Sequence, residues 1–192
     1  MENTMVDKRT ANTKRSLVNA LYSLLQDKSI SDINVRELCE AAKINRGTFY
    51  KYYKNVYDMV TAIENRILSD LEKTLEDAPL AANPDLFVYD LLQLINNSRE
   101  VSRLVFRISD RDFTSKIVSL MRDSTINYWK ERFGCNDEKL LGDIFIFVSH
   151  GIIAMVGQWI ENNDFKDSPH KMANDINHLG DSCVTALAGD GR

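Results

Sequence analysis

Proline and glycine are scarce in this chain of 192 residues, which has three prolines and eight glycines. Both residue types interrupt helices, so their scarcity favours long, uninterrupted helical segments. No stretch keeps the alternation of apolar and polar residues that a half-buried strand shows. Apolar residues recur instead at intervals of three or four, the period of an amphipathic helix. The sequence therefore predicts an all-α protein of about nine helices.

Cysteine is also scarce, and the motifs of several enzyme classes are missing. The three cysteines are far apart and form no CxxC pair, which argues against a disulfide framework or a zinc ribbon. The three histidines lack the spacing with acidic residues that metal sites use. Neither a glycine-rich phosphate loop nor a nucleophile elbow occurs. We expect no metal, no cofactor and no enzymatic activity.

No apolar run approaches the roughly 20 residues that span a bilayer. The longest, Ile144–Ile160, is interrupted by polar residues and glycines. The N-terminal residues lack the apolar segment of a secretory signal. We therefore expect a cytoplasmic protein that makes no membrane contact.

Charge of one sign is not in large excess, because the net charge is −4, but the charges are unevenly distributed. Residues 1–60 hold ten Lys and Arg against seven acids, a net charge of +3, and the remainder carries −7. A basic head on an acidic body is typical of a protein that contacts a polyanion with one end.

Four helices are predicted in the first 77 residues. The second begins after Asn34, an N-cap residue that is followed three positions later by Glu37. The four ranges are Thr10–Asp27, 35–42, Arg46–Tyr53 and Tyr57–Glu76.

The segment Asp77–Pro84 holds two of the three prolines and is predicted to be a connection. Five further helices follow it, and the last has Ser168 as N-cap and Pro169 at its first position. Their ranges are Pro84–Asn97, Arg99–Ile108, Asp110–Phe133, Asp137–Asn162 and Ser168–Ala188.

The second and third helices are joined by the three residues Lys43–Asn45, which predicts a helix-turn-helix. Such a unit places its second helix in the DNA major groove, where base edges can be distinguished. We expect inward packing by Leu38, Ala41, Ala42, Ile44, Phe49 and Tyr53, and outward side chains at Arg46, Gly47, Thr48, Tyr50, Lys51 and Tyr52. A small three-helix packing unit with a solvated basic face is the alternative.

Residues 14–68 resemble the N-terminal domain of the TetR family of transcriptional regulators. The matching segments are Lys14–Leu25, Ile33–Cys39, Ile44–Tyr53 and Asp58–Val60. The resemblance implies a homodimer that binds a palindromic DNA operator. It implies a DNA-binding domain over residues 1–56 and an effector-binding and dimerisation domain over 57–192, linked by the helix 57–76.

The resemblance also implies individual DNA contacts. Arg36 would touch the backbone or a base, and the residues nearest the bases would be Arg46, Gly47 and Lys51. The phosphate contacts would come from Thr48, Tyr50 and Tyr52.

The chain departs from the family pattern at two positions. Lys43 occupies a turn position that is often glycine, so its backbone must adopt a less comfortable conformation. Val56 stands where a phosphate-binding lysine commonly opens the fourth helix. Lys54, two residues earlier, is therefore included among the expected DNA-binding residues.

The helix predicted over Asp137–Asn162 is apolar around its circumference, which is typical of a buried helix. The run Phe145–Trp159 and the residues after it resemble the late helix of one TetR C-terminal subgroup. With the last helix, it is expected to form an isologous four-helix interface, although a monomer core explains the same residues. The expected interface residues are Phe145, Val148, Ile152, Met155, Trp159 and Leu179.

A regulator of this family usually has an effector pocket in its second domain. The candidates for its lining are apolar and aromatic residues with one histidine, namely Phe87, Leu91, Phe106, Phe113, Met121, Tyr128, Trp129 and His150. Ordinary core packing is the alternative, because aromatic residues at helical spacing are common in cores.

The sequence thus leads to two hypotheses for function. The first is a repressor that a small-molecule effector releases from a palindromic operator. The second, which Lys43 and Val56 motivate, is an adaptor or co-activator of the same fold that acts through protein–protein contacts.

Overall fold

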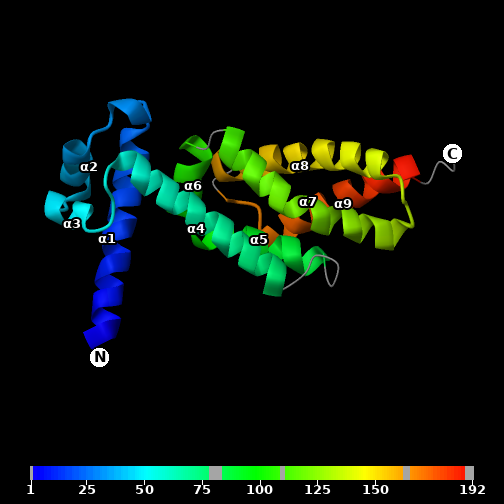
Figure 1. The fold of residues 1–192 in the computed structure, drawn as a ribbon, viewed down its shortest axis with the longest axis horizontal. Helices are drawn as coiled ribbons and strands as arrows, with labels where there is room; N and C mark the ends of the chain where they lie inside the picture. The colour runs from blue at the N-terminus through cyan, green and yellow to red at the C-terminus, as the bar shows by residue number, and fades with distance from the viewer. Residues whose placement is uncertain (1, 78–83, 109–110, 162–164, 189–192) are drawn as a thin grey trace. The chain divides into compact units, whose positions relative to one another are not determined.

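The computed structural model describes residues 2–77, 84–108, 111–161 and 165–188, and these are helical with short connections (Figure 1). The described residues form nine α-helices and one short 3-10 helix, which confirms the predicted all-α class. The elements are α1 (Glu2–Leu24), η1 (Ile30–Asp32), α2 (Val35–Ala42), α3 (Arg46–Tyr50), α4 (Val56–Asp77), α5 (Pro84–Asn97), α6 (Arg99–Ile108), α7 (Arg111–Phe133), α8 (Glu138–Glu161) and α9 (Pro169–Ala188).

The predicted helix boundaries agree with these within a few residues at most ends. The largest differences are at α1, which begins eight residues before Thr10, and at α3, which ends at Tyr50 instead of Tyr53. After Tyr50 the chain turns, because the Tyr52 N–H donates to the Phe49 carbonyl at 2.9 Å. Residues 78–83 of the predicted connection lie outside the described residues, as do Asp110 and Asn162, the predicted ends of two helices.

The chain forms two compact units that are not contiguous in sequence. The first contains α1, α2, α3, α4 as far as Ile67, and α6; the second contains the rest of α4 with α5, α7, α8 and α9. The predicted division at residue 56 assigns α6 to the second domain. In the structure α6 packs against α1, and its Leu104 is fully buried in the core of the first unit. A division drawn along the sequence cannot show this contact.

The core of the first unit holds α3, a helix of five residues. Helices this short are not stable alone in water. Phe49 on α3 is 0% exposed and lies in one cluster with Leu17 and Leu21 of α1, Leu38 of α2 and Met59 of α4. The position of α3 is therefore set by burial of one aromatic side chain.

Most of the predicted inward positions are confirmed. Leu38, Phe49 and Tyr53 are buried, and Ala42 and Ile44 pack against the same core. The prediction for Ala41 is wrong, because this residue is exposed. The helix α2 is only eight residues long, and its inward stripe is too narrow to include Ala41 beside Leu38 and Ala42.

Side-chain caps mark the starts of five described helices, α2, α3, α4, α8 and α9. The Glu37 N–H donates to Asn34 Oδ1 at 3.0 Å, and the Lys171 N–H donates to Ser168 Oγ at 3.2 Å, as the sequence predicts for α2 and α9. At α3, the Gly47 N–H donates to Asn45 Oδ1 at 2.7 Å. Each cap satisfies a backbone donor that has no partner within its helix.

The turn between α2 and α3 depends on Lys43, which has φ 57° and ψ 42°. This left-handed conformation is common for glycine and costs other residues about 1–2 kcal/mol. It allows the Ile44 N–H to donate to the Cys39 carbonyl at 2.9 Å, which closes the end of α2. The expectation of a strained backbone at Lys43 is confirmed.

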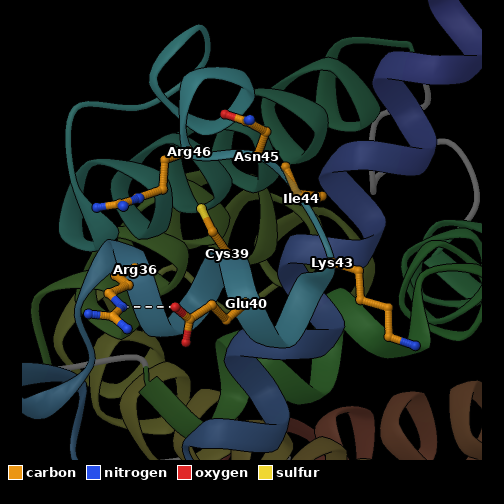
Figure 2. A pocket seen from close by; sticks show the side chains of 7 residues that line it. All are labelled: Arg36, Cys39, Glu40, Lys43, Ile44, Asn45 and Arg46. Atoms are coloured by element: carbon orange, nitrogen blue, oxygen red, sulfur yellow. Dashed lines mark hydrogen bonds and ion pairs between the residues drawn. The ribbon is translucent and has the colours of Figure 1, made fainter.

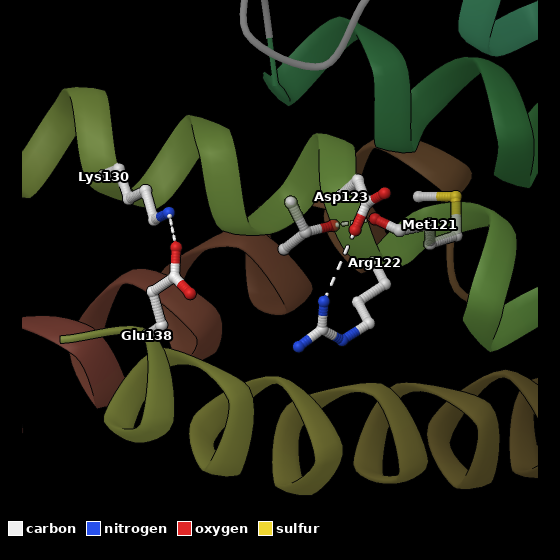
Figure 3. A network of polar contacts seen from close by, with 6 residues as sticks. Met121, Arg122, Asp123, Lys130 and Glu138 are labelled. Carbon is white, nitrogen blue, oxygen red and sulfur yellow. Dashed lines mark hydrogen bonds and ion pairs between the residues drawn. The ribbon is translucent and has the colours of Figure 1, made fainter. Parts of the chain in front are cut away.

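In the second unit, α8 packs against α7 and α9, and α5 packs against α9. Phe87, Trp129, Leu141 and Val184 are buried in its core. An ion pair adds to the contact between α7 and α8, because Lys130 Nζ and Glu138 Oε1 are 2.7 Å apart (Figure 3).

The helix α8 is not buried all around, contrary to the prediction from its composition. Its inner side carries the buried residues Leu141, Ile144 and Phe145, but Phe147 is 73% exposed and Ile146 is exposed as well. Among the described helices, α8 is long and apolar enough to cross a membrane by length and composition, and 22% of its most apolar window is buried. The structure thus leaves one apolar face of α8 uncovered in the single chain.

Replacing Lys43 with glycine should stabilise the protein, because glycine adopts the left-handed conformation without the steric cost. We expect Lys43→Gly to raise the melting temperature by roughly 2–4 °C, for a gain of about 1 kcal/mol. Lys43→Ala is the matched control, because it removes the same side chain and keeps the strain. Circular dichroism melting of both variants makes the comparison, and equal melting temperatures would show that Lys43 is not strained.

Candidate nucleic-acid interface

The side of α3 opposite Phe49 carries exposed polar and basic residues. Arg46, Gly47, Tyr50 and Lys51 are exposed, and Thr48 is half-buried. Within the described residues, Arg46 and Lys51 make no ion pair, so their charges are available to a ligand. Five of the predicted DNA-binding residues therefore lie together on α3 or immediately after it.

A recess of about 430 Å³ lies between α2 and α3 (Figure 2). Three cations and one carboxylate line it, which makes its charge positive at neutral pH. Helical spacing predicted an outward Arg46 and the family resemblance implied a DNA contact at Arg36, but neither indicated that Glu40 and Asn45 line the same recess. The lining residues are Arg36, Cys39, Glu40, Lys43, Ile44, Asn45 and Arg46.

An ion pair spans one turn of α2 at the edge of this recess. Arg36 Nε donates to Glu40 Oε1 at 2.8 Å, and the two side chains are 72% and 65% exposed. The hydrogen bond to Glu40, and then its negative charge, raise the pKa of Arg36 above its ordinary value. The Arg36 side chain therefore lies along the surface of α2, where its Nε is hydrogen-bonded to Glu40.

Cys39 lies on the inner side of the recess and is 2% exposed. Burial raises the pKa of its thiol, and the positive charge of Arg46 opposes this effect in part. The thiolate is the nucleophilic form of cysteine. The Cys39 thiol is thus neutral and protected at physiological pH.

Tyr52 has a second partner that the sequence pattern did not indicate. It is half-buried, and its hydroxyl oxygen lies 3.2 Å from Thr10 Oγ1 of α1. The Lys14 ammonium, also on α1, lies 5.7 Å from the centre of the Tyr52 ring. The residue predicted as a phosphate contact therefore also joins the end of the α3 segment to α1.

Val56 and Lys54 differ in environment. Val56 is 4% exposed and belongs to the core of the first unit, so the first position of α4 serves packing. Lys54 is exposed, and its backbone N–H donates to Asp58 Oδ2 at 2.8 Å. Lys54 is thus an exposed basic side chain in the connection two residues before α4.

A second recess, of about 650 Å³, lies between α1 and the turn after α2. The α1 residues that line it are three or four positions apart, so the sequence spacing already places them on one face of the helix. Arg9 is exposed there. The lining residues are Arg9, Asn12, Thr13, Ser16, Ala42, Lys43 and Ile44.

The expected effector-pocket residues do not all lie together. Phe87, Tyr128 and Trp129 are buried in the core of the second unit, with Leu91 and Met121 packed against it, and Phe113 is buried in the same unit. Phe106 belongs to the first unit through α6. His150 is exposed, and its Nδ1 lies 2.8 Å from the Ile146 carbonyl oxygen of its own helix. Phe106 and His150 therefore do not lie with the other expected pocket residues in the core of the second unit.

The expected dimer residues also differ in exposure. Phe145 and Trp159 are buried within the chain, so they face the core and not a partner. Val148, Ile152 and Met155 are half-buried, and Leu179 on α9 is exposed. The pattern of apolar residues on α8 did not reveal which side packs inward, because both sides are apolar.

Comparison with protein families and curated proteins places the chain among transcriptional regulators. A TetR-type family model, described as the C-terminal region of transcriptional regulators, matches residues 82–181. The uncharacterized HTH-type transcriptional regulator YxbF of Bacillus subtilis (strain 168) is 36% identical over 59 residues. The match covers 31% of this chain and 16% of that relative's length.

Two solved structures have the same fold. The dihydroxyacetone kinase operon activator DhaS matches with a TM-score of 0.58 and 18% identity, over 91% of this chain and 97% of that one. A TetR transcriptional regulator from Streptococcus agalactiae 2603V matches with a TM-score of 0.56 and 17% identity, over 93% and 98%.

Burial of Cys39 predicts slow reaction with thiol reagents. In a chain with Cys135→Ser and Cys183→Ser, we expect Cys39 to react with Ellman's reagent in urea but only slowly in the native state, because the thiol is neutral and covered. Adding Arg46→Ala should slow the native reaction further, since the charge that lowers the Cys39 pKa is lost. Equal native and denatured rates would contradict the burial of this side chain.

Proposed function

Because this chain belongs to the TetR family of transcriptional regulators, we propose that it is a repressor that binds a palindromic operator as a homodimer and that a small-molecule effector releases. The proposal rests on the exposed, unpaired Arg46 and Lys51 on a helix-turn-helix whose other side is held in the core. Membership of the family implies DNA binding and dimerisation. The operator, the effector and the direction of regulation belong to the proposal.

The proposed DNA contacts follow the exposure of each side chain. Arg46, Gly47 and Lys51 approach the base edges, where arginine and lysine can donate to guanine. Thr48, Tyr50 and Lys54 bind phosphates, which set the register of the protein on the duplex. Tyr52 fixes the α3 segment to α1 through Thr10, and its contact with phosphate is made from that position.

The proposed dimer interface is the uncovered apolar face of α8 and α9. Among the described residues of these helices, four large apolar side chains are exposed: Ile146, Phe147, Leu179 and Leu187. Burying such side chains is the main favourable contribution in homodimer interfaces, and a two-fold axis pairs the same surface of both chains. Ile152 and Met155 can extend the contact, while Phe145 and Trp159 support it from within the chain.

The proposed effector site is the aromatic core of the second unit. Phe87, Leu91, Met121, Tyr128 and Trp129 gather there from α5 and α7. Ligand sites are mostly apolar with a few polar groups, and Tyr128 supplies a hydroxyl. An effector that binds better to a conformer with an opened core would shift the population toward it and lower operator affinity.

A second function is an activator or adaptor that acts through protein contacts. Two observations favour it: one solved chain with this fold is named an operon activator, and Val56 is buried where the family commonly has a phosphate-binding lysine. In that case Arg46→Ala together with Tyr52→Ala would leave DNA affinity unchanged while a tight protein partner is recovered. In either case we propose a cytoplasmic protein that acts by binding and not by catalysis.

Removing one base-reading side chain should weaken operator binding specifically. We expect Arg46→Ala to lower the affinity for DNA from its own promoter region by about 10- to 100-fold and to relax its preference over random DNA. Lys139→Ala is the control, because Lys139 is a similarly exposed cation on α8 in the second unit. Fluorescence anisotropy at two salt concentrations measures both. Native protein without preference over random DNA would contradict the proposed function.

Adding a charge to the uncovered face of α8 should prevent dimerisation. We expect Phe147→Glu to shift the protein from dimer to monomer in sedimentation velocity, because an unpaired carboxylate in an apolar interface is strongly unfavourable. Leu94→Glu on α5 is the matched control, since Leu94 is also an exposed apolar residue of the second unit. A stable Phe147→Glu dimer would place the interface elsewhere.

A further inference from the structure

The ion pair between Arg36 and Glu40 is unfavourably placed for helix stability. Arg36 is the second residue of α2 and Glu40 lies in its last turn. The helix dipole favours acidic residues at the start and basic residues at the end, and the order Glu then Lys or Arg is the better one at this spacing. Both side chains are largely exposed, and exposed ion pairs contribute little to stability. Helix stability therefore does not explain the pair.

Non-specific DNA affinity does not explain Glu40 either. Glu40 lines the same recess as Arg46, the first residue of α3, and Figure 2 shows its carboxylate beside Arg36. A negative charge in this position is repelled by phosphates, and phosphate contacts provide most of the affinity for random DNA. The carboxylate thus weakens the general attraction of the recess for DNA.

The hydrogen-bonding groups of the pair match one base pair. In the major groove, guanine presents the acceptors O6 and N7, and cytosine presents the N4 amino donor. Arg36 Nε donates to Glu40 Oε1, so the two side chains are held side by side. The terminal amino groups of Arg36 remain as donors, and the Glu40 carboxylate can accept a further hydrogen bond. Arginine pairs with guanine and glutamate accepts from cytosine N4 in protein–DNA recognition.

We propose that Glu40 is a specificity-determining residue and that the Arg36–Glu40 pair recognises a G·C base pair in each half of the operator. The inference rests on the proposed function and deepens it. Arg36 donates to guanine, and Glu40 accepts from cytosine and holds Arg36 in position. On random sequences without a cytosine in this place, Glu40 finds no N4 donor, so its charge lowers the affinity there.

The test compares the full-length protein with Glu40→Gln and Glu37→Gln. Glu37 is the matched control, because it lies on the same helix, loses the same charge, and pairs with Lys28 outside the recess. Sites are first selected from random DNA with the unchanged protein, and anisotropy then gives the affinity of each variant for the selected site and for random DNA.

We expect the unchanged protein to select a G·C pair at one position of each half-site. Glu40→Gln should retain or increase the affinity for random DNA, and its ratio of specific to random affinity should fall about tenfold or more. Glu37→Gln should leave that ratio unchanged. Glu40→Asp keeps the charge but shortens the reach to Arg36, so it should lose the preference for G·C at that position without a gain in affinity for random DNA.

The outcomes separate this inference from the proposed function. If the unchanged protein prefers a selected site, but Glu40→Gln keeps the same ratio as Glu37→Gln, Glu40 has no role in specificity and the proposed function stands. A selected site without a G·C pair at the position sensitive to Glu40 also overturns the inference. If the unchanged protein has no preference over random DNA, both proposals fail. Circular dichroism melting confirms that each variant is folded.

Discussion

Burial of Phe49 is the contact on which the candidate interface depends. The helix that carries Phe49 has five residues, and its own hydrogen bonds are too few to stabilise it. The aromatic ring is completely covered by side chains from α1, α2 and α4, and Tyr53 packs beside it with ring centres 5.6 Å apart. Because the ring fixes which side of α3 faces the core, the side chains of Arg46, Tyr50 and Lys51 point to solvent. The geometry proposed for DNA recognition thus follows from apolar packing on the opposite side of the same short helix.

The first unit is completed by residues that are distant in sequence. The Arg107 Nε of α6 donates to the Leu25 carbonyl at 3.0 Å, and Leu104 of the same helix is fully buried beside α1. Tyr52 approaches Thr10 and Lys14 of α1 from the other end. The helix α1 therefore packs against both α6 and the residues that follow α3. Because α6 is flanked in sequence by helices of the second unit, the two units are connected by the chain at several points.

The features predicted from the sequence are local ones. The cap at Asn34, the left-handed backbone at Lys43 and the ranges of α5 and α6 depend on residues within a few positions. The features missed depend on contacts between distant segments. Spacing alone placed Tyr52 outward, but its partner Thr10 is 42 residues away. Composition alone predicted a fully buried α8, because a face that packs against a second chain has the same apolar residues as a face that packs in the core. His150 and Phe106 were predicted to line the effector pocket because of their residue types. In the structure His150 is exposed, and Phe106 lies on α6 in the first unit.

We propose that α2, the turn after it and α3 form the DNA-contacting surface of this regulator. Amide hydrogen exchange of the full-length protein, with and without DNA from its own promoter region, tests it most directly. We expect slower exchange in residues 35–54 and in the first turns of α1 when DNA is added, with α8 and α9 unchanged. Unchanged exchange in residues 35–54, with protection in α8 and α9 instead, would contradict it.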